Sequence, residues 1–114
     1  MNAFIEIHHP TAIISIEGRL DAASTTSIQS PILQAASDGH HVLLDMSRVG
    51  FLSSAGLRML LLLYRRVREN QRSMVLMGLT EEVHAIMDIT GFLSLFTIAE
   101  NREQGLRLIA ERAS

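Results

Sequence analysis

The sequence predicts an α/β fold, with a mixed and mostly parallel sheet of about five strands and about four helices. Short apolar segments alternate with longer segments that begin with helix-capping residues, which is the order expected when right-handed crossovers connect parallel strands. The first two strands follow one another without a helix, so we expect an antiparallel hairpin. The chain has 114 residues and 47% hydrophobic content, so we expect residues 1–114 to form a single domain.

The opening hairpin is predicted from two segments rich in β-branched residues, 4–7 and 12–17. The connection between them contains Pro10, which has no N–H and therefore pairs poorly within a ladder. Gly18 is expected to end the second strand, because glycine interrupts a strand pattern.

A first helix is expected to begin near Asp21 or Ser24, which are both good N-cap residues, and to end near residues 38–39. Pro31 falls inside this range, where a proline costs about 3 kcal/mol. Either the helix bends at Pro31, or a new helix begins there with Ser30 as its N-cap. The sequence leaves both alternatives open.

The rest of the chain alternates strands with helices. The helix from Ser54 is apolar on nearly all sides in its first half, so it is either a central core element or it exposes an apolar patch to a partner. The expected elements are strands at 41–46, 74–78 and 95–98, and helices at 54–70, 80–91 and from 101 onward.

The last two helices carry their own start signals. Thr80 is a good N-cap, and Asn101 with Gln104 resembles a capping box. Gly91 is expected to end the first of these helices. The residues expected to face the core are Val83, Ile86 and Met87 in one helix, and Leu106, Ile109 and Ala110 in the other.

Composition excludes several classes of protein. The formal net charge of −2 provides no basic field for direct binding of nucleic acid, and the absence of cysteine excludes disulfides and thiolate metal sites. The N-terminus has no signal-peptide pattern, and the apolar run at residues 59–64 is far shorter than the roughly 20 residues that span a bilayer. We therefore expect a cytoplasmic protein without membrane contact.

An enzyme is not expected. The chain has no Gly-rich phosphate loop and no Gly-x-Ser-x-Gly or His-Glu-x-x-His motif. The histidine pairs at 8–9 and 40–41 are adjacent residues on extended segments, and so point to opposite faces rather than at one metal. We predict no catalytic residue, cofactor or metal; a hydrolase using Ser53 or Ser54 would lack an oriented base.

The most informative segment runs from Asp45 to Leu57 and reads as a buried strand, a short connection, two serines and an apolar helix. One of Ser53 and Ser54 is suited to cap the helix. The other hydroxyl would lie where a phosphate is favourable, since the first backbone N–H groups of a helix lack partners. Gly56 either lets another chain approach the backbone or accommodates tight packing within the domain.

Several motifs together resemble the STAS domain family, which includes sulphate-transporter tails and bacterial anti-sigma factor antagonists. The resemblance covers essentially the whole chain and implies a STAS-like sheet with its helices packed mainly on one face. The chain contains no membrane spans, so it does not look like a transporter tail. The motifs are Gly18-Arg19-Leu20-Asp21, the run from Leu44 to Leu52, Ser53-Ser54-Ala55-Gly56-Leu57, and Ile89-Thr90-Gly91-Phe92 followed by Phe96.

The resemblance implies a regulatory protein that is switched by phosphorylation of Ser54. In that family the unphosphorylated domain binds an anti-sigma factor, which is also a serine-protein kinase, and so frees a sigma factor. Phosphorylation by the same kinase breaks the complex, and a phosphatase resets it. The surface expected to bind the partner comprises Asp21, Ser53, Ser54, Ala55, Gly56 and Arg58.

One position departs from the family pattern. Where the family has an aspartate before the phosphoserine, this chain has Ser53, which can cap the helix but carries no charge. Ser53 is therefore a second candidate for phosphorylation. The alternative function is a STAS interaction or scaffold module in a signalling complex that phosphorylation does not switch.

Overall fold

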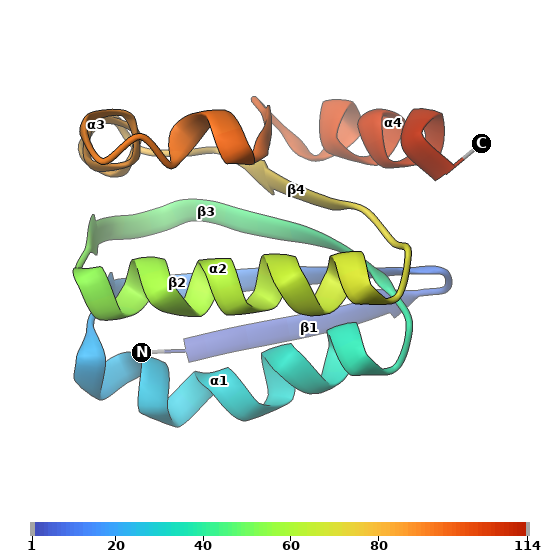
Figure 1. The fold of residues 1–114 in the computed structure, drawn as a ribbon, viewed down its shortest axis with the longest axis horizontal. Coiled ribbons are helices and arrows are strands. Elements are labelled where there is room, and N and C mark those ends of the chain that lie inside the picture. Colours follow the sequence, from blue (N-terminus) through green and yellow to red (C-terminus); the bar gives the residue numbers. More distant parts are fainter. Residues whose placement is uncertain (1, 114) are drawn as a thin grey trace.

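A computed structural model describes residues 2–113 (Figure 1). The strands are β1 (Asn2–His8), β2 (Thr11–Leu20), β3 (His41–Leu52), β4 (Met74–Met77) and β5 (Thr97–Ala99). The α-helices are α1 (Ala22–Ser37), α2 (Ser54–Glu69), α3 (Glu81–Ile89) and α4 (Arg102–Ala113), and a short 3-10 helix, η1, spans Leu93–Leu95.

Within residues 2–113, the strands form one sheet in the order β1-β2-β3-β4-β5. β1 pairs antiparallel with β2, and the other neighbours pair in parallel. The predicted mixed, mostly parallel sheet with an N-terminal hairpin is therefore confirmed. The sheet also brings the carboxyl ends of β2 and β3 together, since Leu20 pairs with Leu52.

The helices cover the two faces of the sheet unequally. In Figure 1, α1 and α2 run side by side, with α2 in front of β2 and α1 below β1. Alternate residues of β3 divide between two apolar clusters, because successive side chains of a strand point to opposite faces. Leu44 packs in the larger cluster with residues of α1, α2 and α3, whereas Leu43 packs in the smaller one with Ile109 of α4.

β2 and β3 continue beyond the ends that the sequence predicted for them. Gly18 does not end β2, which continues to Leu20, and β3 continues to Leu52 instead of leaving a connection before the serines. The two extensions pair with each other, with register shifts on either side of the Glu17 and Gly18 pairs. Gly18 has a φ of 114°, a left-handed conformation that glycine adopts at little cost, so the strand bends there and continues.

The first helix runs through Pro31 without a break, with Asp21 as its N-cap and Asp38 as its C-cap. Ser30 is therefore not the start of a new helix. The helix predicted from Ser54 is a core element, because Leu60, Leu63 and other residues along it are buried. Thr80 caps α3, which ends before Gly91 as expected.

The C-terminal part differs from the prediction in detail. Leu95 belongs to η1 and is 41% exposed, and β5 begins only at Thr97. In α4, Ile109 is buried as predicted, but Leu106 and Ala110 are exposed. Gly105 is buried in their place, because it lets the helix approach the sheet closely at Leu43.

The predicted capping box at the start of α4 is only half formed. Asn101 Oδ1 accepts a hydrogen bond from the Gln104 N–H at 2.9 Å, as a cap should. The Gln104 side chain instead accepts from the N–H of Glu100, one residue before the cap. Among the helices described in residues 2–113, none is long and apolar enough to cross a bilayer.

Candidate functional site

The candidate site lies where β2 and β3 end beside each other and each leads into a helix. Leu20 and Leu52 are the last residues of these strands, and Asp21 and Ser53 are the N-caps of α1 and α2. The carbonyl of Leu20 accepts hydrogen bonds from the Ser53 N–H at 3.0 Å and from Ser53 Oγ at 3.2 Å. The two helix starts are thus held together by the backbone.

Asp21 is fixed by a reciprocal capping box. Its carboxylate accepts from the Ser24 N–H at 3.0 Å, and Ser24 Oγ accepts from the Asp21 N–H at 2.9 Å. The hydrogen bond from the Ser24 backbone is the main reason that the pKa of Asp21 lies below its usual value. Asp21 is therefore a negative charge of fixed position next to the start of α2.

The hydroxyl of Ser53 makes hydrogen bonds within the domain. Its Oγ accepts from the Gly56 N–H at 3.2 Å and donates to the Leu20 carbonyl. The backbone of Ser53 is extended, with φ of −87° and ψ of 175°, as expected for an N-cap. Of the two serines, Ser53 is the cap.

Ser54 is the first residue of α2 and is exposed. Within residues 2–113 its hydroxyl has no hydrogen-bond partner. The N–H groups of Gly56 and Leu57 bond to Ser53, whereas those of Ser54 and Ala55 begin the helix without an intrahelical acceptor. The geometry therefore combines a free hydroxyl with an end of a helix that favours negative charge.

Gly56 faces inward. It is buried, and a Cβ atom added there would overlap the Leu20 carbonyl oxygen and lie 2.9 Å from Leu52 Cδ1. Tight packing within the domain therefore explains the glycine. Contact between a partner and the turn around Gly56 stays a prediction.

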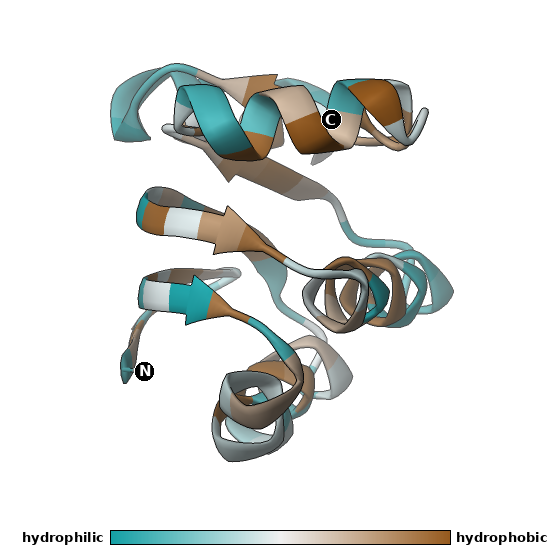
Figure 2. Cartoon of the chain, turned by 90° about the vertical axis from the view of Figure 1, so that its left-hand side faces the viewer, coloured by the Kyte–Doolittle hydropathy of each residue, from teal (hydrophilic) through white to brown (hydrophobic). Residues whose placement is uncertain are grey.

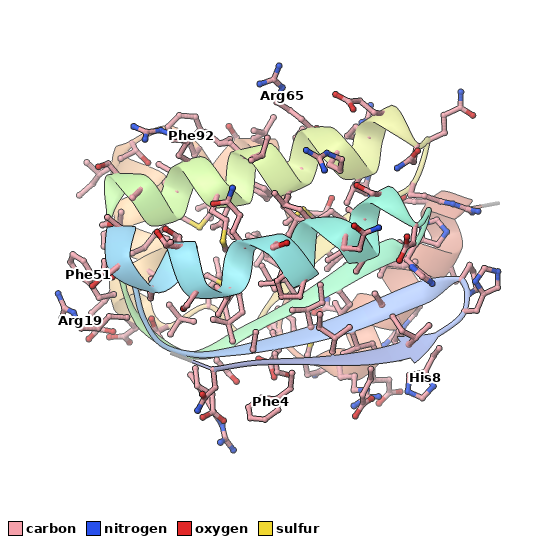
Figure 3. All side chains as sticks on the ribbon, turned by 90° about the horizontal axis from the view of Figure 1, so that it is seen from below. Phe4, His8, Arg19, Phe51, Arg65 and Phe92 are labelled. Carbon is pink, nitrogen blue, oxygen red and sulfur yellow. The ribbon has the colours of Figure 1, made fainter. Side chains whose placement is uncertain are left out.

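Sequence reasoning missed one pair of side chains at this site. The Arg19 guanidinium lies over the ring of Phe51, 4.1 Å from the ring centroid, and Figure 3 shows both side chains extending from the same end of the sheet. A usable signal was present, since each residue stands two positions before a helix cap. Arg58 is exposed one turn after Ser54 and completes the set of charged residues named from the sequence.

The histidines lie apart from this site. His8 contacts Glu6 at 3.1 Å, and the rings of His9 and His40 meet edge to face. His41 is buried and accepts a hydrogen bond from the Ser73 N–H. Over the described part of the chain, no group of three or more His, Cys, Asp or Glu side chains could hold a metal ion.

In a comparison with known protein families, the family model described as STAS domain matches residues 2–105. Among curated proteins, BtrV of Bordetella bronchiseptica, provisionally described as an anti-sigma factor antagonist, is 34% identical over 92 residues. The match covers 80% of this chain and 79% of BtrV. An anti-sigma-B factor antagonist of Staphylococcus epidermidis is 24% identical over 106 residues, with 90% and 98% of the two chains covered.

Solved structures share the fold. The unphosphorylated form of the anti-sigma factor antagonist SpoIIAA superimposes with a TM-score of 0.81 at 18% identity, covering 96% of this chain and 97% of SpoIIAA. An anti-sigma factor antagonist from Mycobacterium paratuberculosis gives a TM-score of 0.86 at 19% identity, and the superposition covers 96% of this chain and 93% of that protein.

Proposed function

Because the chain belongs to the STAS domain family and its curated relatives are anti-sigma factor antagonists, we propose that it is an anti-sigma factor antagonist controlled by phosphorylation of Ser54. In the unphosphorylated form it binds an anti-sigma factor in the cytoplasm and releases a sigma factor. It acts by binding and not as an enzyme. The observation that carries the proposal is that Ser54, the first residue of α2, is exposed and its hydroxyl has no hydrogen-bond partner among residues 2–113.

Ser54 fits the acceptor role better than Ser53. The Ser53 hydroxyl is engaged on both sides, by the Gly56 N–H and the Leu20 carbonyl. Adding a phosphate to it would remove the hydrogen bond that it donates to the Leu20 carbonyl and would disturb the cap of α2. Ser54 is free of such contacts, so its hydroxyl can enter the active site of a kinase without disturbing the fold.

The phosphoryl group would come from ATP bound to the anti-sigma factor, acting as a serine-protein kinase. Ser54 Oγ forms a bond to the γ-phosphorus, the bond from that phosphorus to the bridging oxygen breaks, and ADP leaves. The hydroxyl proton passes to a base of the kinase. A phosphatase restores the hydroxyl with water and releases inorganic phosphate.

Phosphorylation would act mainly on the complex rather than on the domain. It adds about −1.5 to −2 charges beside a helix N-terminus, which tolerates negative charge. Arg58 lies one turn further along, on the same side of a helix as Ser54, and adds a positive charge nearby. A partner packed against Ser54, Ala55 and Asp21 would meet the new charge in a desolvated interface, and so would dissociate.

The test mixes the protein with its anti-sigma factor, with and without ATP, and follows complex formation and the site of modification by mass spectrometry. The wild-type complex is expected to dissociate as phosphate appears on Ser54. Ser54→Ala should bind and stay bound with ATP, whereas Ser54→Asp should bind more weakly. The matched control, Ser53→Ala, should still become phosphorylated at Ser54.

The second candidate is a STAS interaction module that phosphorylation does not switch. It is favoured by Ser53, because this neutral cap leaves Ser54 without the adjacent carboxylate that a kinase would find in the related family motif. The same experiment separates the two functions. A complex that persists with ATP, with neither serine modified, would contradict the switch and support the second candidate.

A further inference from the structure

β1 exposes an unusual amount of apolar side chain for an edge strand. Of the large hydrophobic residues that are exposed within residues 2–113, three lie on this seven-residue strand. They are Phe4 at 56%, Ile7 at 50% and Ile5 at 37% exposure. Ile5 and Ile7 point to one face of the sheet and Phe4 to the other, where Figure 3 shows it directed away from α1 and α2.

The backbone edge of β1 is open. Among residues 2–113, β1 pairs only with β2, and the pairing runs from Asn2 to His8 without a register shift. The strand contains no lysine or proline, which commonly protect sheet edges from pairing. Figure 3 looks onto this edge, where β1 and α1 are both at the front and no other ribbon element covers β1.

The surface beside this edge carries little unbalanced charge. α1 contacts β1, and its residues 22–37 include no charged side chain, so this lowest helix of Figure 2 is pale over much of its length. On the strand, Glu6 is paired with Arg102 at 2.9 Å and contacts His8. Interfaces between proteins are depleted of charge at their centres, and this surface has that composition.

We propose that two copies of this chain associate through β1, forming one antiparallel sheet that continues across both molecules. The opposite edge of the sheet, β5, has only three residues, so a head-to-tail contact of β1 with β5 would leave most of β1 unpaired. Two β1 strands can pair with each other along their whole length, because an antiparallel pair is compatible with a two-fold axis.

The sequence of β1 selects the register. With Ile5 on the two-fold axis, all seven residues are paired, Ile5 faces Ile5 of the second copy, and Glu6 faces Phe4. Moving the axis to Glu6 would oppose two carboxylates directly and would shorten the paired segment. The register centred on Ile5 therefore combines the longest pairing with no directly opposed like charges.

The first experiment measures the mass of the wild-type protein in solution by sedimentation velocity over a wide range of concentration. The expected mass is twice the chain mass of 12.6 kDa. Ile5→Lys should shift the protein to the monomer. Leu106→Lys is the matched control, because Leu106 is also 37% exposed but lies on α4, and this variant should remain dimeric.

The second experiment tests the register by disulfide formation, which is simple to interpret because the chain has no cysteine. In Ile5→Cys, two Cα atoms would lie about 5.5 Å apart across the axis, within disulfide range. In Asn2→Cys, the two cysteines would be about 20 Å apart along the strands. Mild oxidation should therefore cross-link the first variant and not the second.

Several results would overturn the dimer. These are a monomeric wild-type mass at every concentration, an assembly that keeps growing beyond two chains, and a dimer that persists in Ile5→Lys. Circular dichroism establishes that each variant is folded. If Ile5→Lys does not fold, the cross-linking comparison decides, since failure of Ile5→Cys to cross-link contradicts the proposal.

Discussion

Two adjacent serines differ in role because their surroundings differ. Ser53 is fixed by the Leu20 carbonyl and the Gly56 N–H, whereas Ser54 is exposed and its hydroxyl makes no hydrogen bond within the described part of the chain. Gly56 affects the position of both serines, because its lack of a side chain lets the first turn of α2 pack directly against the Leu20 backbone. The position of the proposed acceptor therefore depends on a glycine that does not itself face the solvent.

Replacement of Gly56 by alanine is expected to destabilise the protein. The added Cβ would overlap a backbone oxygen, which cannot move aside as a side chain can. We expect a loss of about 1–3 kcal/mol in the free energy of unfolding, measured by urea denaturation. Gly50→Ala is the control, because a Cβ there meets nothing within 4 Å, and a change within about 0.5 kcal/mol is expected. Equal stability of the two variants would contradict the packing argument.

His41 makes the fold sensitive to acid. It is 3% exposed, its Nδ1 accepts from the Ser73 N–H at 3.0 Å, and its Nε2 is buried without a partner among the described residues. Protonation of Nδ1 would remove that hydrogen bond and place a charge in the interior. Burial, followed by the nearby charge of Arg72, lowers the pKa of His41 from its ordinary value of 6.5.

The unfolded chain therefore binds a proton at His41 more readily than the folded protein does. This contribution to stability is fully present above pH 6.5 and is lost as the pH falls from there toward the folded-state pKa. We expect His41→Gln to lose less stability than the wild type between about pH 7 and pH 5, as measured by urea denaturation. His84→Gln changes an exposed histidine outside the core and is the control variant. Identical slopes for all three proteins would contradict this role of His41.

The N-termini of the two helices at the site are stabilised by N-cap side chains and not by acidic residues in the first turn. Neither α1 nor α2 has an acidic residue in its first turn, and their N-caps are Asp21 and Ser53. Because both caps contact or follow Leu20, the two helix starts are fixed relative to each other. This arrangement presents Asp21 and Ser54 on one connected surface.

The cap of α2 can be tested by substitution. Ser53→Ala should lower the free energy of unfolding by about 1 kcal/mol, because the Gly56 N–H loses its acceptor. Ser53→Asp should restore the cap and add a favourable charge near the helix N-terminus, so its stability should be at or above that of the wild type. Ser54→Ala is the control and should change stability by less than about 0.5 kcal/mol. A larger loss in Ser54→Ala than in Ser53→Ala would reverse the assignment of the cap.

At the scale of the whole molecule, the sheet is covered unequally on its two sides. Among the helices described in residues 2–113, α1, α2 and α3 pack on the face of the larger apolar cluster. α4 packs on the other face, where the smaller cluster contains Leu43, Val75 and Ile109. α4 approaches closely because Gly105 faces the sheet. A Cβ at Gly105 would lie 2.5 Å from Leu43 Cδ1, a side-chain atom of a residue with no exposed surface.

This contact predicts a coupling between α4 and β3. Gly105→Ala alone should destabilise the protein, because Leu43 has no free space into which it can move. In a Leu43→Val background, the same alanine should lower the free energy of unfolding less, because valine lacks the Cδ atoms that the new Cβ would meet. Alanine also favours the helix more than glycine does. We expect a coupling of at least about 0.5 kcal/mol in a double-mutant cycle followed by urea denaturation. Additive effects would contradict the contact.

Local patterns were sufficient to predict the fold class, the order of the elements, most helix boundaries and the segment that contains Ser53 and Ser54. These depend on short-range physics, such as capping by Asp21 and Thr80 and the apolar periodicity of α3. The errors fall where distant segments meet. Gly18 looked like a strand end, but β2 continues because β3 supplies a pairing partner for its last residues.

The same distinction applies to the site. The chain itself points to two serines at a helix start, which is enough to propose a phosphorylation switch. Contacts between segments more than thirty residues apart hold Ser53 against the Leu20 carbonyl and bring Arg19 onto Phe51, and the packing leaves Ser54 exposed. They also leave the outer edge of β1 without a pairing strand among the described residues. Exposure and pairing are properties of the packed molecule, because they depend on which other segments occupy the surrounding space.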